Sequence, residues 1–245
     1  MNVSLYQAAA AMNANARWQE LISENLANSS VPGARKLDIS FAALQTGFTP
    51  SLNGDQSVIP AAHMGINFQQ GTIRPSGSPM DFAIEGPGFF EVQLPNGDHA
   101  YTRDGEFQLN AQGQMVTKTG NPVLSDGGPI QFDPNNASPI TVSSTGEVSQ
   151  GGDVKGRLRL VEFNDPHLLT SIGGGCFLAN HQDLLAKDST ASSVRQGYLE
   201  GSNTSPTSEM ASLITAMRMF EANQRVLQMQ DERMGHVISE LGSPT

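Results

Sequence analysis

Residues 205–241 read SPTSEMASLITAMRMFEANQRVLQMQDERMGHVISEL, and the spacing of their apolar side chains predicts one long helix. An apolar residue recurs at every seventh position, at Leu213, Phe220, Leu227, Met234 and Leu241. This is the period of a helix that packs lengthwise on another helix. Met210 and Met217 occupy part of the second line of that seam. Pro206 after Ser205 is typical of the first turn of a helix.

A weaker pattern of the same kind predicts a second helix near the N-terminus. Apolar or small side chains follow one face at Leu5, Ala8, Met12, Ile22 and Leu26, with Asn15 and Gln19 between them. Asparagine lowers helix propensity, so we expect packing to stabilise this helix. Pro32 and Gly33 then end it. Asn25 and Asn28, in the stretch ENLANSS at 24–30, can hydrogen-bond across a crowded helix interface.

Between these segments the apolar period changes to two. Phe82 and Ile84 are two residues apart, and so are Phe90 and Val92. Similar pairs follow further along the chain: Phe107 and Leu109, Ile140 and Val142, Leu158 and Leu160. Turn sequences such as PNGD and STGE separate them. Short strands between such turns predict an antiparallel, all-β domain.

The sequence therefore predicts an α+β fold in four parts. Residues 1–31 form an N-terminal helix, 32–77 an extended linker or loop, 78–204 a central β domain of short antiparallel strands, and 205–241 a C-terminal helix. We expect the two helices to pair in a coiled-coil-like core domain, because a single helix at either end has no other helix to pack on.

Composition and charge exclude several classes of protein. The chain has 245 residues and a net charge of -10, and an acidic chain without a long basic run is a poor candidate for binding nucleic acid or an anionic membrane. The single cysteine, Cys176, excludes an intramolecular disulfide. No window approaches the length of about 18 apolar residues that a membrane span needs. The first residues, MNVSLYQAAAAMNANARW, lack the basic and apolar segments of a secretory signal peptide.

The residue types that carry chemistry in enzymes form no recognisable motif. None of the five histidines has a second metal-ligating residue at a known metal-binding spacing. Cys176, in GGGCF, lacks the base that a catalytic thiol needs. The glycine groups match neither a phosphate-binding loop nor a dinucleotide-binding loop. We therefore expect no catalytic residue, cofactor, metal or small-molecule substrate.

The narrow apolar lines on the two helices leave two interpretations open. The helices pack on the β domain of an ordinary monomer, or they contact helices of other copies of the chain. A narrow line suits contact between helices better than contact with a sheet, which needs a broader face, so assembly is favoured. The expected interface consists of Leu5, Met12, Ile22, Asn25, Leu26, Asn28, Leu213, Met217, Phe220, Leu227, Met234 and Leu241.

Several stretches resemble the flagellar basal-body rod and hook proteins, in the same order along the chain. ENLANSS at 24–30 is similar to the N-terminal signature of that family. Three longer stretches are also similar to it: SPMDFAIEGPGFFEVQLPNG at 78–97, AYTRDGEFQLNAQGQMVTKTGNPVL at 100–124 and QGYLEGSNTSPTSEMASLITAMRMFEANQRVLQ at 196–228. One departure is Ala34, where the family usually has an aromatic residue after the glycine.

The resemblance implies a structural subunit of the bacterial flagellar rod, the hollow drive shaft that transmits torque from the motor to the hook. Such proteins polymerise helically, with paired terminal helices lining the tube and the β domain outside. The implied partners are further copies of the chain, neighbouring rod and hook proteins, and the surrounding basal-body ring proteins. The implied location is the basal body, spanning the periplasm, after export by the flagellar type III apparatus without a cleavable signal peptide.

Other interpretations stay open at this stage. Within the rod, the resemblance does not separate a proximal from a distal position. A hook or hook-junction subunit and a non-flagellar coiled-coil surface tubule would share the same helices. An enzyme with a β domain and helical dimerisation arms would need a pocket with converging titratable groups.

Overall fold

The computed structural model describes residues 3–45 and 58–242 of the chain. For residues 3–7, 41–45, 58–63, 237–238 and 240–242 it describes the backbone alone. The chain divides into two compact units, each built from separate stretches of sequence. We call Met1–Ala27, Leu37–Ile66 and Ser205–Thr245 the helix–hairpin unit, and Asn28–Lys36 with Asn67–Thr204 the β-rich unit.

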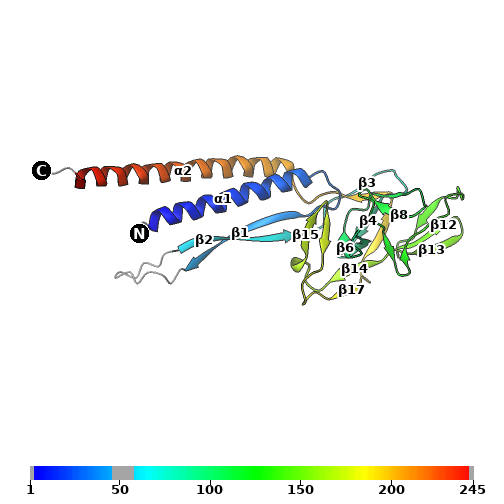
Figure 1. Ribbon diagram of the computed structural model, residues 1–245. Coiled ribbons are helices and arrows are strands. Elements are labelled where there is room, and N and C mark those ends of the chain that lie inside the picture. Colours follow the sequence, from blue (N-terminus) through cyan, green and yellow to red (C-terminus); the bar gives the residue numbers. More distant parts are fainter. Residues whose placement is uncertain (1–2, 46–57, 243–245) are drawn as a thin grey trace. The chain divides into compact units, whose positions relative to one another are not determined.

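The helix–hairpin unit contains two helices and one two-stranded sheet. The elements are α1 (Val3–Asn28), α2 (Pro206–Gly242), β1 (Lys36–Gln45) and β2 (Val58–Asn67). Figure 1 shows α1, in blue, between α2 and the hairpin of β1 and β2, with the two helices running in opposite directions. α2 has 37 residues and α1 has 26, so α2 is longer by about 16 Å. Within the described residues, neither helix is long and apolar enough to cross a membrane.

α1 buries a broad face because it has neighbours on two sides. Its buried side chains are Ala8, Ala14, Asn15, Leu21, Ile22 and Asn25. Three of these lie on the predicted narrow line, and the others widen it. The predicted coiled-coil-like core domain, formed by the two terminal helices alone, is therefore wrong. The unit also contains the β1–β2 hairpin, to which α1 is hydrogen-bonded.

The segment predicted as an extended linker or loop over residues 32–77 differs in the structure. It contains β1, β2 and the short strand β3 (Ile73–Pro75). Leu37, Ile39 and Phe41 alternate with polar residues in the sequence, which is the pattern of a strand. The glycine- and proline-rich stretches that follow obscured this short signal.

α2 buries one of the two predicted lines of side chains in part and leaves the other exposed. Leu213, Phe220 and Leu227 are half-buried, as the period of seven predicts. The second line of buried positions, however, contains Glu209 and Ala216, which are 2% and 0% exposed. It lies one residue before the predicted line of Met210 and Met217. Those two methionines therefore remain at the surface.

The β-rich unit is built from short antiparallel strands, as the apolar period of two predicts. Its largest sheet has the order β15 (Thr170–Gly173), β16 (Cys176–Leu178), β6 (His99–Thr102), β5 (Phe89–Gln93), β14 (Leu160–Phe163) and β17 (Ala186–Asp188). A three-stranded sheet contains β11 (Ile140–Val142), β12 (Glu147–Gln150) and β13 (Asp153–Arg157).

The remaining strands of this unit form pairs, and one short 3-10 helix, η1 (Pro166–Leu168), precedes β15. The pairs are β4 (Phe82–Glu85) with β18 (Ser193–Gln196), β3 with β19 (Tyr198–Glu200), β7 (Phe107–Leu109) with β8 (Met115–Thr117), and β9 (Leu124–Ser125) with β10 (Gly128–Pro129). In β18–β4 and β19–β3, strands from opposite ends of the unit's sequence lie side by side.

The core of the β-rich unit joins strands that are far apart in sequence. The ring of Phe107 lies 5.9 Å from that of Phe82 and 5.1 Å from that of Phe90. The backbone approaches closely at Gly105, where an added Cβ would lie 1.7 Å from the carbonyl oxygen of Phe82. A side chain at this position would therefore force the strands apart, which explains why the DG turn needs its glycine.

Asp104, beside that glycine, is a half-buried carboxyl group in the same turn. Its Oδ1 accepts a hydrogen bond from the backbone N–H of Glu106 at 2.9 Å. Burial raises the pKa of Asp104 to about 6; the negative charges of Glu106 and Asp81 add to this, while Lys118 opposes it. The folded chain therefore binds this proton more tightly than the unfolded chain. The stabilisation is complete below pH about 4 and is lost as the pH rises through about 6.

We expect the Asp104→Asn variant to abolish this pH dependence, because the amide keeps the Oδ1 acceptor but does not ionise. The free energy of unfolding of the variant, relative to the unmodified chain, should rise between pH 4 and pH 7 by up to about 3 kcal/mol. Urea unfolding at several pH values measures this difference. A difference that stays constant over that range would contradict the assignment.

Candidate functional site

A hollow between α1 and α2 is lined mainly by small and apolar side chains. Its volume is about 440 Å³, and its lining residues are Ala11, Ala14, Asn15, Trp18, Met219, Ala222 and Asn223. Alanines on both helices leave this space open within the helix–hairpin unit. The volume lies in the range that a drug-sized ligand or several side chains can fill, so the hollow is a concave apolar surface available to another molecule.

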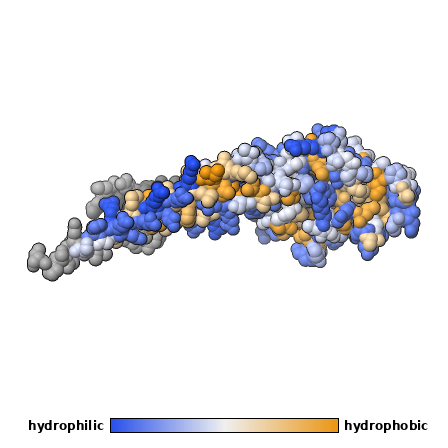
Figure 2. Space-filling view, turned by 90° about the horizontal axis from the view of Figure 1, so that it is seen from above, coloured by the Kyte–Doolittle hydropathy of each residue, from blue (hydrophilic) through white to orange (hydrophobic). Residues whose placement is uncertain are grey.

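α2 exposes large apolar side chains next to its buried side. Met210, Ile214 and Met217 follow at steps of four and three residues, which places them on one side of the helix. Their exposed fractions are 53%, 53% and 51%, and we call these three residues the methionine line of α2. Figure 2 shows apolar residues, in orange, on the surface over α2. Contiguous apolar patches larger than roughly a few hundred Å² are rare on soluble monomers and mark interaction sites, so this line is a candidate contact surface.

The predicted interface residues differ in how far their side chains are exposed. Ile22 and Asn25 are buried within the chain. The half-buried members are Met12, Leu26, Asn28, Leu213, Phe220 and Leu227. Met217 and Met234 are exposed. The side chains of Leu5 and Leu241 lie outside the described residues.

Asn25 is bonded within its own chain. Its Nδ2 donates to the carbonyl oxygen of Leu37 at 2.8 Å, and its Oδ1 accepts from the N–H of Leu37 at 2.7 Å. This pair of bonds joins the end of α1 to the start of β1. The amide therefore fixes the hairpin on α1, a role that sequence reasoning missed because residue 37 falls in the segment predicted as a linker.

Glu200, at the end of β19, is fully buried between two arginines of the β-rich unit. Its Oε1 accepts from Arg35 Nη1 at 2.6 Å and from the N–H of Gly71 at 2.9 Å. Its Oε2 accepts from Arg103 Nη1 at 3.2 Å. The carbonyl oxygen of Glu200 also accepts from the N–H of Gly33 at 2.8 Å. Glu200 thus joins β19 to three other segments of the unit, which contain Gly33 with Arg35, Gly71 and Arg103.

Arg103 remains positively charged in this site. Burial lowers the pKa of Arg103 to about 10, against the opposite effect of the Glu200 carboxylate. Its Nη2 donates to the carbonyl oxygen of Gly86 at 2.6 Å, and its guanidinium lies 4.9 Å from the centre of the Phe89 ring. Nε of both arginines and Nη2 of Arg35 find no acceptor among the described residues. The Glu200 carboxylate is therefore the main compensation for two buried positive charges.

Sequence reasoning gave this ion-pair cluster no role. Arg35 and Glu200 are 165 positions apart, and a single sequence does not show a pairing over such a distance. The stretches YTRDG and LEGSN, which contain Arg103 and Glu200, lie within the segments that resemble rod proteins. That resemblance was the one sequence signal that could have pointed to Arg103 and Glu200.

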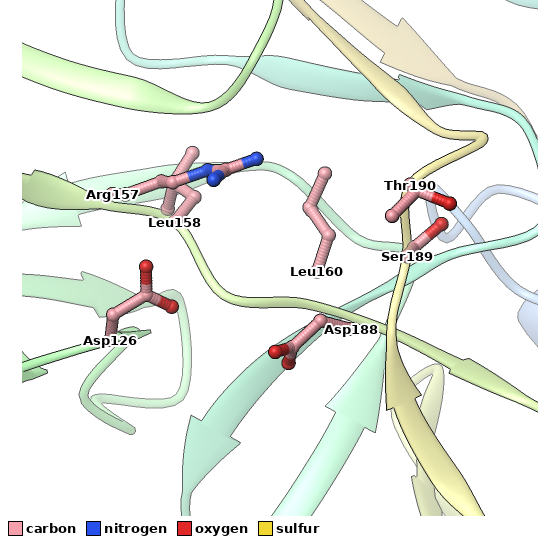
Figure 3. Close-up of a pocket in the computed structure, with 7 residues that line it drawn as sticks. All are labelled: Asp126, Arg157, Leu158, Leu160, Asp188, Ser189 and Thr190. Atoms are coloured by element: carbon pink, nitrogen blue, oxygen red, sulfur yellow. The ribbon is translucent and has the colours of Figure 1, made fainter.

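A smaller hollow of about 120 Å³ lies in the β-rich unit (Figure 3). Its lining residues are Asp126, Arg157, Leu158, Leu160, Asp188, Ser189 and Thr190. Figure 3 shows the carboxylates of Asp126 and Asp188 on separate segments, well apart from one another. Arg157 Nε is bonded to the carbonyl oxygen of Thr145 at 3.0 Å. The hollow is smaller than usual ligand pockets and brings no pair of carboxylates together.

The other candidates for chemistry are placed as follows. Cys176 is half-buried, and burial raises the pKa of its thiol. Its Sγ donates to the carbonyl oxygen of Gly174 at 3.9 Å. Within the described part of the chain, no group of three or more His, Cys, Asp and Glu residues is arranged to hold a metal ion.

Both ends and the centre of the chain match models of flagellar protein families. Residues 5–35 match "Flagella basal body rod protein", and residues 195–240 match "Flagellar basal body rod FlgEFG protein C-terminal". Residues 83–150 match "Flagellar hook protein FlgE/F/G D1 domain". The chain is 34% identical to the flagellar basal-body rod protein FlgF of Caulobacter vibrioides, over 92% of this chain and 92% of that relative.

The chain belongs to the flagellar basal-body rod protein family. It is also 32% identical to FlgG of Caulobacter vibrioides, over 94% of this chain and 96% of that relative. It is 30% identical to FlgF of Salmonella typhimurium, over 96% of each chain. The predicted resemblance to rod proteins is confirmed. Members of this family are structural proteins of the flagellar basal body, so the surfaces of the rod-family helices are the features to which we assign function.

We expect the Glu200→Gln variant to lower the free energy of unfolding of this rod-family chain by about 3–5 kcal/mol, because it leaves two buried guanidinium groups without a counter-charge. The matched control is Asp153→Asn, which removes an exposed carboxylate that pairs with the half-buried Lys155. That change should cost less than about 1 kcal/mol. Urea unfolding compares the two variants, and equal effects would show that Glu200 does not balance the arginines.

Proposed function

We propose that this rod-family protein polymerises head to tail, through surfaces of its terminal helices, into the hollow rod that transmits torque from the flagellar motor to the hook. The observation that carries the proposal is the methionine line of α2. These three large apolar side chains are about half exposed on a helix that also lines an apolar hollow. Membership of a family of rod structural proteins identifies further copies of the chain as the partner to expect.

The methionine line supplies a driving force for association. Fully burying one large apolar side chain contributes about 1.5–3 kcal/mol. Three half-exposed side chains therefore offset only part of the cost of bringing two proteins together, which is 4 kcal/mol or more by usual estimates. Burial of the half-buried residues Leu213, Phe220 and Leu227 would add to it. A contact of this strength is formed stably when each subunit touches several neighbours, as in a tube.

The methionine line and the alanine-lined hollow together explain how subunits can be added to the polymer repeatedly. The methionine line is convex and the alanine-lined hollow is concave, so they are different surfaces of one chain. A contact between unlike surfaces is heterologous, and unless its rotation closes a ring it can be repeated without limit. We propose that a side chain of the size of methionine from one subunit enters the hollow of the next.

The predicted interface residues take two roles in this proposal. Met12, Leu26, Asn28, Leu213, Met217, Phe220, Leu227 and Met234 contribute exposed or half-buried surface, and Leu5 and Leu241 complete the predicted set. Ile22 and Asn25 act from within, because they hold α1 against its own unit.

The proposed partners and location follow from the family. We propose contacts with further copies of the chain, with neighbouring rod and hook proteins and with the surrounding basal-body rings. The proposed site is the part of the basal body that spans the periplasm, reached by type III export without cleavage of a signal peptide. The proposal assigns no catalytic residue, cofactor or nucleic acid to the chain.

A second candidate function is a hook or hook-junction subunit. It is favoured by one observation, the match of residues 83–150 to a model described as a hook protein domain. Electron microscopy of purified basal bodies that carry a tagged chain separates the two, because a rod subunit is labelled between the motor and the hook. Label within the hook would favour the second candidate.

The Met217→Asp variant tests the assembly surface. A charge in the methionine line should prevent incorporation into basal bodies and abolish swimming, because it would have to be buried in the contact. The control is Val154→Asp, which changes an apolar residue of the β-rich unit that is 61% exposed. It should leave assembly unchanged. Rods of normal length in cells that contain only the Met217→Asp chain would refute the surface.

A further inference from the structure

The chain passes between the helix–hairpin unit and the β-rich unit four times. The passages follow Ala27, Lys36, Ile66 and Thr204. Each passage is a single length of polypeptide at the end of a helix or strand: α1 ends at Asn28, β1 begins at Lys36, β2 ends at Asn67 and α2 begins at Pro206. The direction of such a segment relative to the β-rich unit is set by the bonds that its end makes within that unit. The bonds that fix the ends within the β-rich unit therefore decide whether the passages move independently or together.

Asn203 bonds to the ends of two other passages. Its Oδ1 accepts from the N–H of Lys36 at 2.7 Å. Its Nδ2 donates to the carbonyl oxygens of Asn67 at 2.8 Å and Gln69 at 2.9 Å. Asn203 itself precedes the last residue of the β-rich unit, Thr204. One side chain thus joins three of the four passages, and all of these atoms belong to the β-rich unit.

Further hydrogen bonds of residues 200–203 hold the same chain segments. The backbone N–H of Asn203 donates to the carbonyl oxygen of Ala34 at 3.4 Å, and that of Gly201 donates to Thr72 at 2.9 Å. Glu200, three residues before Asn203, bonds to Arg35 and Gly71. The segments that Asn203 joins are therefore anchored a few residues further into the unit as well. Their directions at the edge of the unit depend on the side chain that links them.

We propose that Asn203 is a positioning residue, which fixes the directions in which three chain segments leave the β-rich unit and so makes the two units turn together under load. The claim that the two units turn together under torque rests on the proposed function as a rod subunit. The geometric part does not, because it concerns bonds within one chain. If the ends of these segments were not bonded, one unit could twist without the other. Torque would then not be transmitted between the two units.

Gln196 provides a matched control in the same unit. Its Oε1 accepts from the N–H of Val142 at 3.0 Å, and its Nε2 donates to the carbonyl oxygens of Pro79 at 2.7 Å and Ile140 at 2.9 Å. This is the bonding pattern of Asn203, with one backbone donor and two backbone acceptors. Gln196 joins segments inside the β-rich unit, away from the passages. Any general effect of losing such an amide should be the same at both residues.

The experiment compares Asn203→Asp with Gln196→Glu in the full chain. Each change keeps the acceptor oxygen and places a carboxylate oxygen against two carbonyl oxygens. The first measurement is the rate of tryptic cleavage after Lys36, which is half-buried and bonded to Asn203. We expect cleavage to be at least tenfold faster in Asn203→Asp and unchanged in Gln196→Glu, although both variants lower the melting temperature by similar amounts. Equal cleavage rates in the two variants would overturn the inference.

The second measurement is the swimming speed in a viscous medium of cells that carry each variant. We expect Asn203→Asp to reduce the speed at least twofold relative to Gln196→Glu, or to fail to enter rods while its β-rich unit stays folded; either result supports a positioning role. Equal swimming speeds of the two variants would contradict the claim that the two units turn together under torque. Absence of the unmodified chain from basal bodies would contradict the proposed function instead, and the cleavage comparison would still decide the positioning role.

Discussion

The central constraint on this chain is that α2 carries more apolar side chains than its own unit covers. Ala216 of α2 is completely buried, yet Met210, Ile214 and Met217 of the same helix remain about half exposed. Within this unit α1 lies between α2 and the β1–β2 hairpin, as Figure 1 shows, so the hairpin packs on α1 and not on α2. The helix–hairpin unit is thus folded but incompletely buried, which is the property expected of a subunit that completes its packing in an assembly.

In the β-rich unit, polar side chains fix the segments through which the chain enters and leaves the unit. Glu200 joins Arg35 and Arg103 in a buried cluster, and Asn203 links Lys36 to Asn67 and Gln69. A buried ion pair contributes little net stability compared with apolar packing, but it is costly to break and it specifies one arrangement. Polar bonds are therefore placed where the direction of the chain matters, and apolar packing fills the interior of the unit.

Elements whose apolar side chains recur at a regular spacing could be predicted from the sequence. Features that depend on contacts between residues far apart in the sequence could not. Both terminal helices and strands such as β4 and β5 were predicted from their spacing, and the rod family from motifs along the chain. The coiled-coil-like core was wrong because the helix pattern gave no sign that a hairpin packs on α1. The line through Glu209 and Ala216 was missed because a carboxylate and an alanine are weak seam residues. Glu200 and Asn203 were missed because the partners of their side chains are 97 or more positions away.

The most direct test of the account is the oxidation of individual methionines by hydrogen peroxide, measured by mass spectrometry in the isolated chain and in purified rods. Exposed methionines are converted to sulfoxide, and buried ones are protected. The account predicts that Met210 and Met217 are oxidised readily in the isolated chain and at least tenfold more slowly in rods. Equal oxidation rates in the two states would show that the methionine line stays exposed after assembly, and that another surface joins the subunits.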